Sequence, residues 1–210
     1  MIRIGIVKEY KVPNDYRTPF TPSQAKKIMS NKIMDVFCQK SDIRCYKDEE
    51  YLSKKIKVVD DLNESDIIFG IKEVPIPELI ANKTYFMFSH TIKKQSYNRE
   101  LLKTIIKKKI RLIDYECLKS NNKRIIAFGN YAGIAGTYNT LMAYGIKFKK
   151  FNWKRLSYFK DTKELYKFSN LNPLNDPIKI LIIGNGRVAS GAVELLESFN
   201  IKRVSIKDYL

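Results

Sequence analysis

The sequence has few cysteines, a single histidine and no long apolar run. Cys38, Cys45 and Cys117 form no CxxC pair, so we expect reduced thiols rather than a disulfide framework. One histidine without such a pair argues against a structural zinc site, and no metal is predicted. The apolar segment 178–183 has the length of a strand and is far short of the ~20 residues that a membrane-spanning helix needs.

The N-terminus, MIRIGIV, reads as a short alternating strand and lacks the apolar region of a signal peptide. We therefore expect a cytoplasmic protein that does not engage a membrane. The chain has 210 residues, 44% of them hydrophobic, which is enough for one large domain or two small ones with real cores.

The charge balance is strongly basic, with 39 Lys and Arg against 22 Asp and Glu. Because the lysines are spread along the chain and Asn, Ile and Tyr are also abundant, we attribute the charge to genome composition and do not expect a nucleic-acid partner. Two alternatives stay open: a field that attracts an anionic substrate and a dinucleotide, and a nucleic-acid face on segment 147–158. That segment interleaves lysines with Phe148, Phe151, Trp153 and Tyr158.

Strands and helices alternate along the chain, which predicts an α/β fold with a mostly parallel sheet covered by helices. Expected strands are 3–7, 34–39, 66–71, 85–89, 110–114 and 124–128, and expected helices are 22–30, 48–55, 97–108 and 135–145, the first capped by Thr21. Segment 148–177 is polar, with Asn-Pro and Asp-Pro turns, and reads as a linker. We expect a Rossmann-like N-terminal substrate and catalytic domain at 1–147 and the beginning of a dinucleotide-binding Rossmann domain at 178–210.

The glycine-rich segment KILIIGNGRVA predicts a dinucleotide site, because an expected strand runs into a G-x-G-x-x-A loop that opens a helix. Gly184 permits the tight turn, Gly186 lets a pyrophosphate approach the backbone, and Arg187 and Val188 open the helix whose free N–H groups face phosphate. Asp208, near the end of a second strand expected at 203–206, is placed to bind ribose hydroxyls. Its acidic character favours NAD over NADP, although NADP stays possible. An ordinary glycine turn is the alternative.

This second domain supplies two of the six strands that a complete dinucleotide-binding domain needs. The chain is therefore expected to be either a fragment or a protein that has lost its cofactor domain, and we expect weak or no turnover from it alone. The oligomeric state is not predicted.

Ionisable side chains follow two of the buried strands. Lys72 and His90 each stand at a strand end, and ligands of open α/β sheets bind beyond the carboxyl ends of the strands. A lysine and a histidine there are suited to proton transfer near neutral pH. Arg17, in the loop after the first strand, could clamp a carboxylate. On position alone, each could instead be an ordinary loop or structural residue.

The segments GIKE, FSHTIKKQ, IRLIDYECL, RIIAFGNYAGIAG and ILIIGNGRVASGAVELL together resemble the lysine-forming saccharopine dehydrogenases and the lysine–2-oxoglutarate reductase domain. The opening segment IGIVKEYKVPNDYRTPFTP resembles the wider alanine dehydrogenase and transhydrogenase superfamily. The resemblance spans nearly the whole chain in the right order.

The resemblance implies an NAD(P)-dependent oxidoreductase that interconverts saccharopine with lysine and 2-oxoglutarate. It implies that Lys72 and His90 share acid–base catalysis. It further implies that Arg17 and Arg124 hold substrate carboxylates, and that Lys93 and Glu116 belong to the same pocket and tune the pair.

Two other functions are retained. An alanine dehydrogenase would need a small pocket for pyruvate, and the FSHT and DYE segments speak against it. A non-catalytic, truncated paralogue that binds a metabolite or a partner chain is the alternative from another class.

Overall fold

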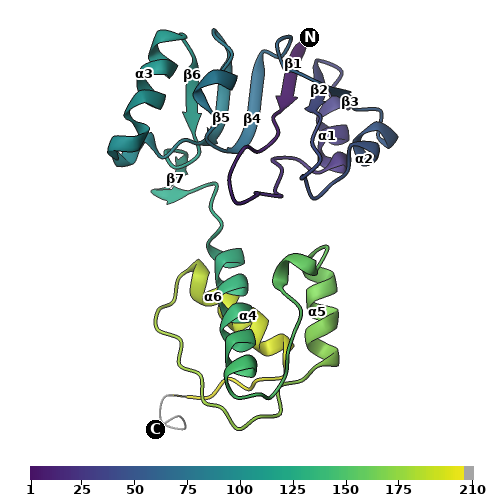
Figure 1. The fold of residues 1–210 in the computed structure, drawn as a ribbon, viewed down its shortest axis with the longest axis vertical. Coiled ribbons are helices and arrows are strands. Elements are labelled where there is room, and N and C mark those ends of the chain that lie inside the picture. The colour runs from purple at the N-terminus through teal and green to yellow at the C-terminus, as the bar shows by residue number, and fades with distance from the viewer. Residues whose placement is uncertain (206–210) are drawn as a thin grey trace. The chain divides into compact units, whose positions relative to one another are not determined.

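The computed structural model describes residues 1–205 and divides the chain into two compact units, 1–127 and 128–210 (Figure 1). The first unit is built around a six-stranded sheet in the order β3-β2-β1-β4-β5-β6. Its strands are β1 Ile2–Ile6, β2 Met34–Gln39, β3 Lys57–Val59, β4 Ile67–Lys72, β5 Thr84–Phe88 and β6 Arg111–Asp114.

All five strand pairings of this sheet are parallel. The order reverses between β1 and β4, as in a doubly wound Rossmann-like fold, so the predicted α/β class with a parallel sheet is confirmed. In such sheets the crevice for a ligand opens beyond the carboxyl ends of the strands beside that reversal, here β1, β4 and β5.

Helices cover the sheet on both faces. Alternate residues of β2 point to opposite faces: Val36 and Cys38 pack with α1 Pro22–Met29 and α2 Asp48–Ser53, whereas Phe37 belongs to the cluster around α3 Arg99–Lys107. The helix start is as predicted, because the Thr21 hydroxyl accepts a hydrogen bond from the Gln24 N–H at 3.2 Å.

Short elements complete the first unit. They are the 3-10 turns η1 Ile76–Glu78, η2 Thr91–Lys93 and η3 Ser96–Asn98, and the antiparallel pair β7 Lys119–Ser120 and β8 Lys123–Arg124. The strand expected at 124–128 is therefore not part of the large sheet. The nearest strand is β8, which pairs with β7 in this separate hairpin.

The described part of the second unit is helical: α4 Gly129–Lys147, η4 Leu156–Tyr158, α5 Thr162–Leu171 and α6 Arg187–Ser198. Helices α4 and α6 pack closely, since a Cβ on Gly133 would lie 2.0 Å from the Val188 carbonyl oxygen and one on Gly191 would lie 2.0 Å from that of Asn130. α4 therefore groups with the second unit, and the units divide at 127/128 rather than at the expected 147.

Segment 148–177 is not an irregular linker. Asp161 caps α5 by accepting a hydrogen bond from the Glu164 N–H at 2.9 Å, and Leu165 of this helix is buried in the core of the second unit. Phe151 and Trp153 stack with ring centroids 4.1 Å apart, and Trp153 stacks on Phe199 of the same core. Phe148 lies with its ring centroid 4.9 Å from that of Tyr144 in α4, so three of the four aromatic residues of segment 147–158 contribute to packing.

The strand expected at 178–183 is not formed: among residues 1–205 no strand pairs with this segment, and Ile183 is 91% exposed. An extended segment becomes a strand only when a neighbour supplies backbone hydrogen bonds, and no described strand lies beside it. Residues 203–205 likewise do not form a strand, and Asp208 lies outside the described residues.

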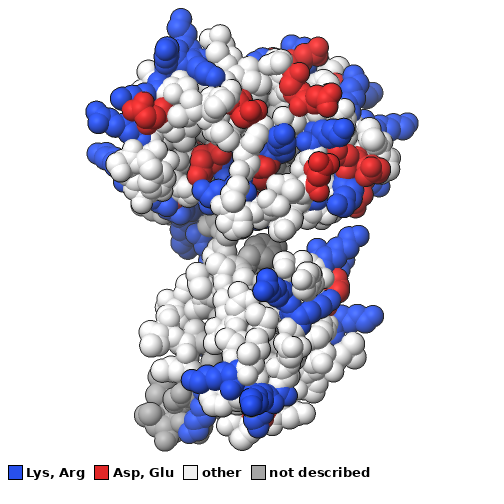
Figure 2. Space-filling model, in the orientation of Figure 1, with Lys and Arg blue, Asp and Glu red and all other residues white. Residues whose placement is uncertain are grey.

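Basic side chains are scattered over the face shown in Figure 2, with acidic groups between them on the first unit. In the part of the chain that the structure describes, no helix combines the length and the apolarity needed to cross a membrane.

Candidate active site

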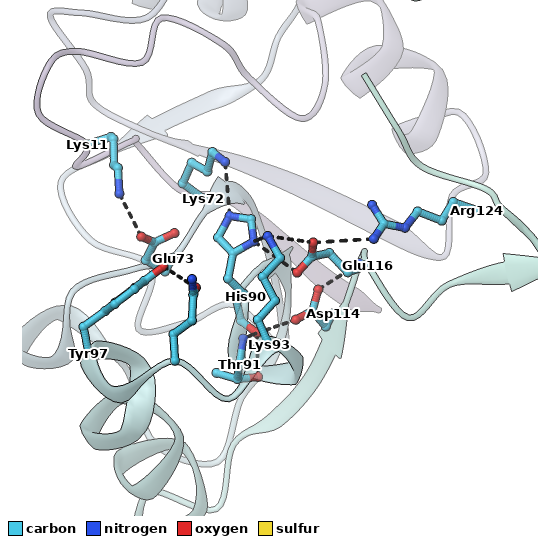
Figure 3. A network of polar contacts seen from close by, with 12 residues as sticks. Lys11, Lys72, Glu73, His90, Thr91, Lys93, Tyr97, Asp114, Glu116 and Arg124 are labelled. Atoms are coloured by element: carbon cyan, nitrogen blue, oxygen red, sulfur yellow. Dashed lines mark hydrogen bonds and ion pairs between the residues drawn. The ribbon is translucent and has the colours of Figure 1, made fainter. Parts of the chain in front are cut away.

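Lys72 and His90 meet at the carboxyl end of the sheet (Figure 3). Lys72 is the last residue of β4, and His90 follows the neighbouring strand β5 by two residues. Their Nζ and Nε2 atoms are 3.2 Å apart. The pair therefore forms because two adjacent parallel strands end at the same edge, with the register of β4 against β5 shifting between Phe69 and Lys72.

Glu116 lies on the other side of the imidazole. Its Oε2 is 3.0 Å from His90 Nδ1, while its Oε1 is 3.3 Å from Lys93 Nζ and 3.7 Å from Arg124 Nη2. Burial opposes ionisation of Glu116, but hydrogen bonds from His90 and Lys93 outweigh it and hold the pKa of this carboxyl below its ordinary value. An ionised carboxylate thus sits behind the imidazole.

These partners select one form of the neutral His90 ring. A carboxylate only accepts hydrogen bonds, so Nδ1 facing Glu116 carries the hydrogen; an ammonium only donates, so Nε2 facing Lys72 is left as the acceptor. Lys93 Nζ also lies 3.2 Å from Nδ1, and it has the Glu116 carboxylate as its acceptor. The arrangement favours a proton path from Lys72 to His90 Nε2.

The pair is reachable from solvent. The His90 side chain keeps 19% of its surface exposed, and its ring packs against Phe88 with centroids 6.3 Å apart and planes 21° apart. Lys72 Nζ lies 5.9 Å from the centre of the Phe88 ring. The apolar Phe88 ring beneath these two ionisable groups lowers the local dielectric and strengthens their interaction.

Arg17 is held by Asp15. Its Nε and Nη2 donate to the two carboxylate oxygens at 2.8 and 2.5 Å, a bidentate pair. Hydrogen bonding to Arg17 lowers the pKa of Asp15, and the positive charge of Lys72 contributes to the same shift. Arg17 thus belongs to the charge network around the pair, with Asp15 as a partner that the sequence did not reveal.

Glu9, which the sequence interpretation missed, links β1 to β4. It follows β1 and is only 7% exposed, and its Oε1 and Oε2 accept hydrogen bonds from the Ile71 and Lys72 N–H groups at 2.6 and 2.9 Å. These N–H groups lie where β1 has moved away from β4, so a side chain replaces the missing strand neighbour. The sequence offered only an acidic residue three positions after the end of β1.

Glu73 and Lys11 form a second polar pair beside Lys72 (Figure 3). Lys11 Nζ is 2.9 Å from Glu73 Oε1, and the Glu73 Oε2 is buried without a hydrogen-bond partner among the described residues. Burial alone would raise the pKa of Glu73, but the hydrogen bond and charge of Lys11, with a contribution from His90, hold this pKa below its ordinary value. A buried acceptor oxygen thus stands next to the pair.

The glycine-rich loop lies in the second unit and is described by itself. Gly184 has φ +116°, which requires glycine, and Gly186 precedes α6, whose first residue is Arg187. A Cβ on either glycine would meet no atom within 4 Å, and Val188 is 55% exposed. The helix N-terminus and the glycine backbone are therefore open to an anionic ligand.

Comparisons with known proteins agree on the relatives. Residues 5–135 match the family described as alanine dehydrogenase/PNT, N-terminal domain. The chain is 40% identical over 132 residues to the mitochondrial alpha-aminoadipic semialdehyde synthase of Bos taurus, covering 62% of this chain and 14% of that protein. It is 26% identical over 219 residues to the NAD(+), L-lysine-forming saccharopine dehydrogenase of Yarrowia lipolytica, covering 92% and 57%.

The chain therefore spans little more than half the length of the fungal dehydrogenase and a small part of the mammalian synthase. Among solved structures, the transhydrogenase of Sinorhizobium meliloti has the same fold, with a TM-score of 0.54 at 17% identity, covering 68% of this chain and 44% of that one. The family match over most of the first unit, the fold and the shared relatives lead to one conclusion: this chain belongs to the alanine dehydrogenase/PNT N-terminal domain family, among relatives of the saccharopine dehydrogenase type.

Proposed function

We propose that the protein acts as an NAD(P)-dependent oxidoreductase on the CH–NH group of an amino acid and interconverts saccharopine with L-lysine and 2-oxoglutarate. The observation that carries the proposal is the 3.2 Å contact between Lys72 Nζ and His90 Nε2 at the crevice end of the sheet. The fungal relatives, which are NAD(+), L-lysine-forming saccharopine dehydrogenases, supply the reaction class and the NAD preference.

The pair suits the proton transfers of this reaction. Oxidation of a secondary amine to an imine releases the amine proton, and hydrolysis of the imine needs a water molecule to be deprotonated. His90 can take a proton at Nε2 from the Lys72 ammonium, and the neutral Lys72 amine can then take the proton that the substrate amine or the water releases. The Glu116 carboxylate stabilises the imidazolium that forms.

The surroundings suit a ligand with several carboxylates and an amine. Saccharopine carries three carboxylates, and Arg17, Lys93 and Arg124 supply positive charge around the pair. Each is already engaged by Asp15 or Glu116, so a substrate carboxylate would exchange with or join these contacts. The unpartnered Glu73 Oε2 is a candidate acceptor for the substrate amine.

The residues of the glycine-rich loop fit a dinucleotide. The open backbone at Gly184 and Gly186 and the N-terminus at Arg187 and Val188 would hold its pyrophosphate, and Asp208 stays a predicted ribose ligand. When bound, the nicotinamide supplies the hydride acceptor or donor. The preference for NAD over NADP stays a prediction. The cytoplasmic location also stays a prediction, since the mammalian relatives are mitochondrial proteins.

A ligand titration tests the proposal. Because the chain contains one histidine, the imidazole C–H signal in NMR spectra reports on His90 alone. We expect saccharopine to shift this signal and pyruvate with ammonium to leave it unchanged, with Lys72→Met and Arg17→Met weakening the response. Lys54→Met, an exposed lysine of α2's C-terminal turn, is the matched control.

Turnover is measured in parallel as reduction of NAD or NADP by saccharopine. A response to pyruvate instead of saccharopine would favour the alanine dehydrogenase function. If wild-type protein responds to neither ligand, the non-catalytic paralogue is the better description.

A further inference from the structure

Asp114 occupies the last position of β6 and directs its two carboxylate oxygens to two different parts of the site (Figure 3). The residue is only 7% exposed and has no role in the acid–base chemistry described above. A buried carboxylate is costly unless its oxygens are well satisfied, so its contacts indicate what it stabilises.

The first oxygen reaches the residues that flank His90. Asp114 Oδ2 accepts a hydrogen bond from the Ser89 hydroxyl, which is fully buried. Ser89 Oγ in turn accepts the Thr91 N–H at 3.2 Å and lies 2.9 Å from Thr91 Oγ1. His90 stands between these two residues.

The backbone of His90 needs this support. Its φ is 57° and its ψ is 7°, in the left-handed region, which costs a residue other than glycine energy and persists only where the surroundings impose it. The hydroxyls on either side, anchored by Asp114, are the contacts that hold the segment.

The second oxygen reaches the partner of the imidazole. Asp114 Oδ1 accepts the Glu116 N–H at 2.8 Å, which fixes the turn that aims Glu116 at His90. The Glu116 Oε2 to His90 Nδ1 distance of 3.0 Å therefore joins two groups that are both tied to one carboxylate.

We propose that Asp114 is a positioning residue: by holding the His90 segment through Ser89 and the Glu116 backbone at the same time, it keeps Glu116 on Nδ1 and leaves Nε2 facing Lys72. The proposal deepens the proposed function, because it assigns the residue that orients the acid–base pair. Its geometry, however, can be tested without substrate, cofactor or turnover.

The identity of the side chain matters because two acceptors are needed. An asparagine has one carbonyl oxygen and one amide group that only donates, so Asp114→Asn keeps the size but loses the charge and one acceptor. If its oxygen keeps the Glu116 N–H, the Ser89 hydroxyl can stay bonded only by reversing to accept from the amide, which removes the charge-assisted bond of that arm. Ser89→Ala removes the arm to the His90 segment and leaves the bond to the Glu116 N–H in place.

The experiment is long-range proton–nitrogen NMR of the single histidine, recorded at a pH where the ring is neutral. Wild-type protein is expected to show hydrogen on Nδ1. Asp114→Asn is expected to lose at least about half of the separation between the two ring nitrogen signals, as both ring forms become populated. Asp42→Asn, at an exposed aspartate in the same unit, should match wild type.

Amide spectra of each variant establish that it is folded. If Asp114→Asn does not fold, Ser89→Ala carries the test, with a smaller loss of separation expected. Hydrogen on Nε2 in wild type, or wild-type nitrogen signals in folded Asp114→Asn and Ser89→Ala, would overturn the proposal. Failure of saccharopine to bind wild type would count against the proposed function and leave this result unaffected.

Discussion

Glu9 makes the stability of the first unit depend on pH in a direction opposite to that of an ordinary ion-paired carboxylate. Its carboxylate is buried between β1 and β4, where it accepts the Ile71 and Lys72 N–H groups. Desolvation outweighs these hydrogen bonds and raises the pKa of Glu9 from 4.5 to about 7, with Asp15 adding to the rise and Arg17 opposing it.

The magnitude follows from linkage. The folded protein keeps a proton on Glu9 at pH values where the unfolded chain has released it, so the free energy of unfolding falls as the pH rises from about 4.5 to about 7. A pKa difference of this size corresponds to about 3 kcal/mol. The carboxyls with lowered pKa, including Glu73 and Glu116, act below the ordinary carboxyl range. Between pH 5 and 7, the difference between wild type and Glu9→Gln therefore isolates the contribution of Glu9.

The assay is urea unfolding at several pH values between 5 and 8, followed by amide signals of β1 and β4 so that only the first unit is observed. Wild type is expected to lose up to about 3 kcal/mol across this range, whereas Glu9→Gln should lose much less. Glu49→Gln, at an exposed glutamate of α2, is the matched control and should follow wild type. Equal pH dependence in wild type and Glu9→Gln would refute the reasoning.

Three further predictions concern packing and burial. Gly133→Ala should destabilise the second unit by about 1–3 kcal/mol or more, because its Cβ would overlap α6. Gly136→Ala in the same helix meets open space and should stabilise the unit by about 0.5–1 kcal/mol. Thermal unfolding followed by the fluorescence of the single tryptophan distinguishes the two variants, and equal effects would contradict the packing of α4 on α6. Arg44→Met should cost about 3 kcal/mol in urea unfolding, because it removes the buried cation that pairs with Asp48 and leaves that carboxylate with only the Ser41 N–H as a partner among the described residues. An unchanged midpoint would show that the pair contributes nothing. Cys38 is fully buried with its pKa raised to about 12, so it should react with a thiol reagent only on unfolding. Exposed Cys117 should react at once, and Cys45, which is exposed but has its pKa raised by burial of the thiol, should react more slowly. Rapid modification of all three would disprove the burial of Cys38.

Local patterns predicted the elements whose residues carry their own signal. The strand expected at 34–39 is observed as Met34–Gln39, and the Thr-Pro start predicted the first residue of α1. Helix α5 was missed because its polar and aromatic composition resembles a loop, and its apolar side chains find their place only in the core of the second unit. The strand expected at 178–183 was predicted but is not formed. Its apolar pattern can be read locally, whereas a strand also needs a neighbouring strand to pair with, which the local pattern does not supply.

The candidate site divides in the same way. Lys72, His90 and Arg17 could be named from their places after strands, and the family resemblance added Lys93, Glu116 and Arg124. The roles of Glu9 and Asp114 could not be read in advance, because each depends on backbone groups that lie far away in sequence or across a turn.

The sequence by itself therefore determined the α/β class, the order of most elements, the family resemblance and the side chains able to exchange protons, because composition, periodicity and motif spacing are local properties of a chain. Only the tertiary structure decided which charges meet: that Lys72 lies 3.2 Å from His90, that Asp15 engages Arg17, and that two buried carboxylates brace the crevice. The physical reason is that these contacts depend on strand order and register, which are determined by packing over the whole sheet.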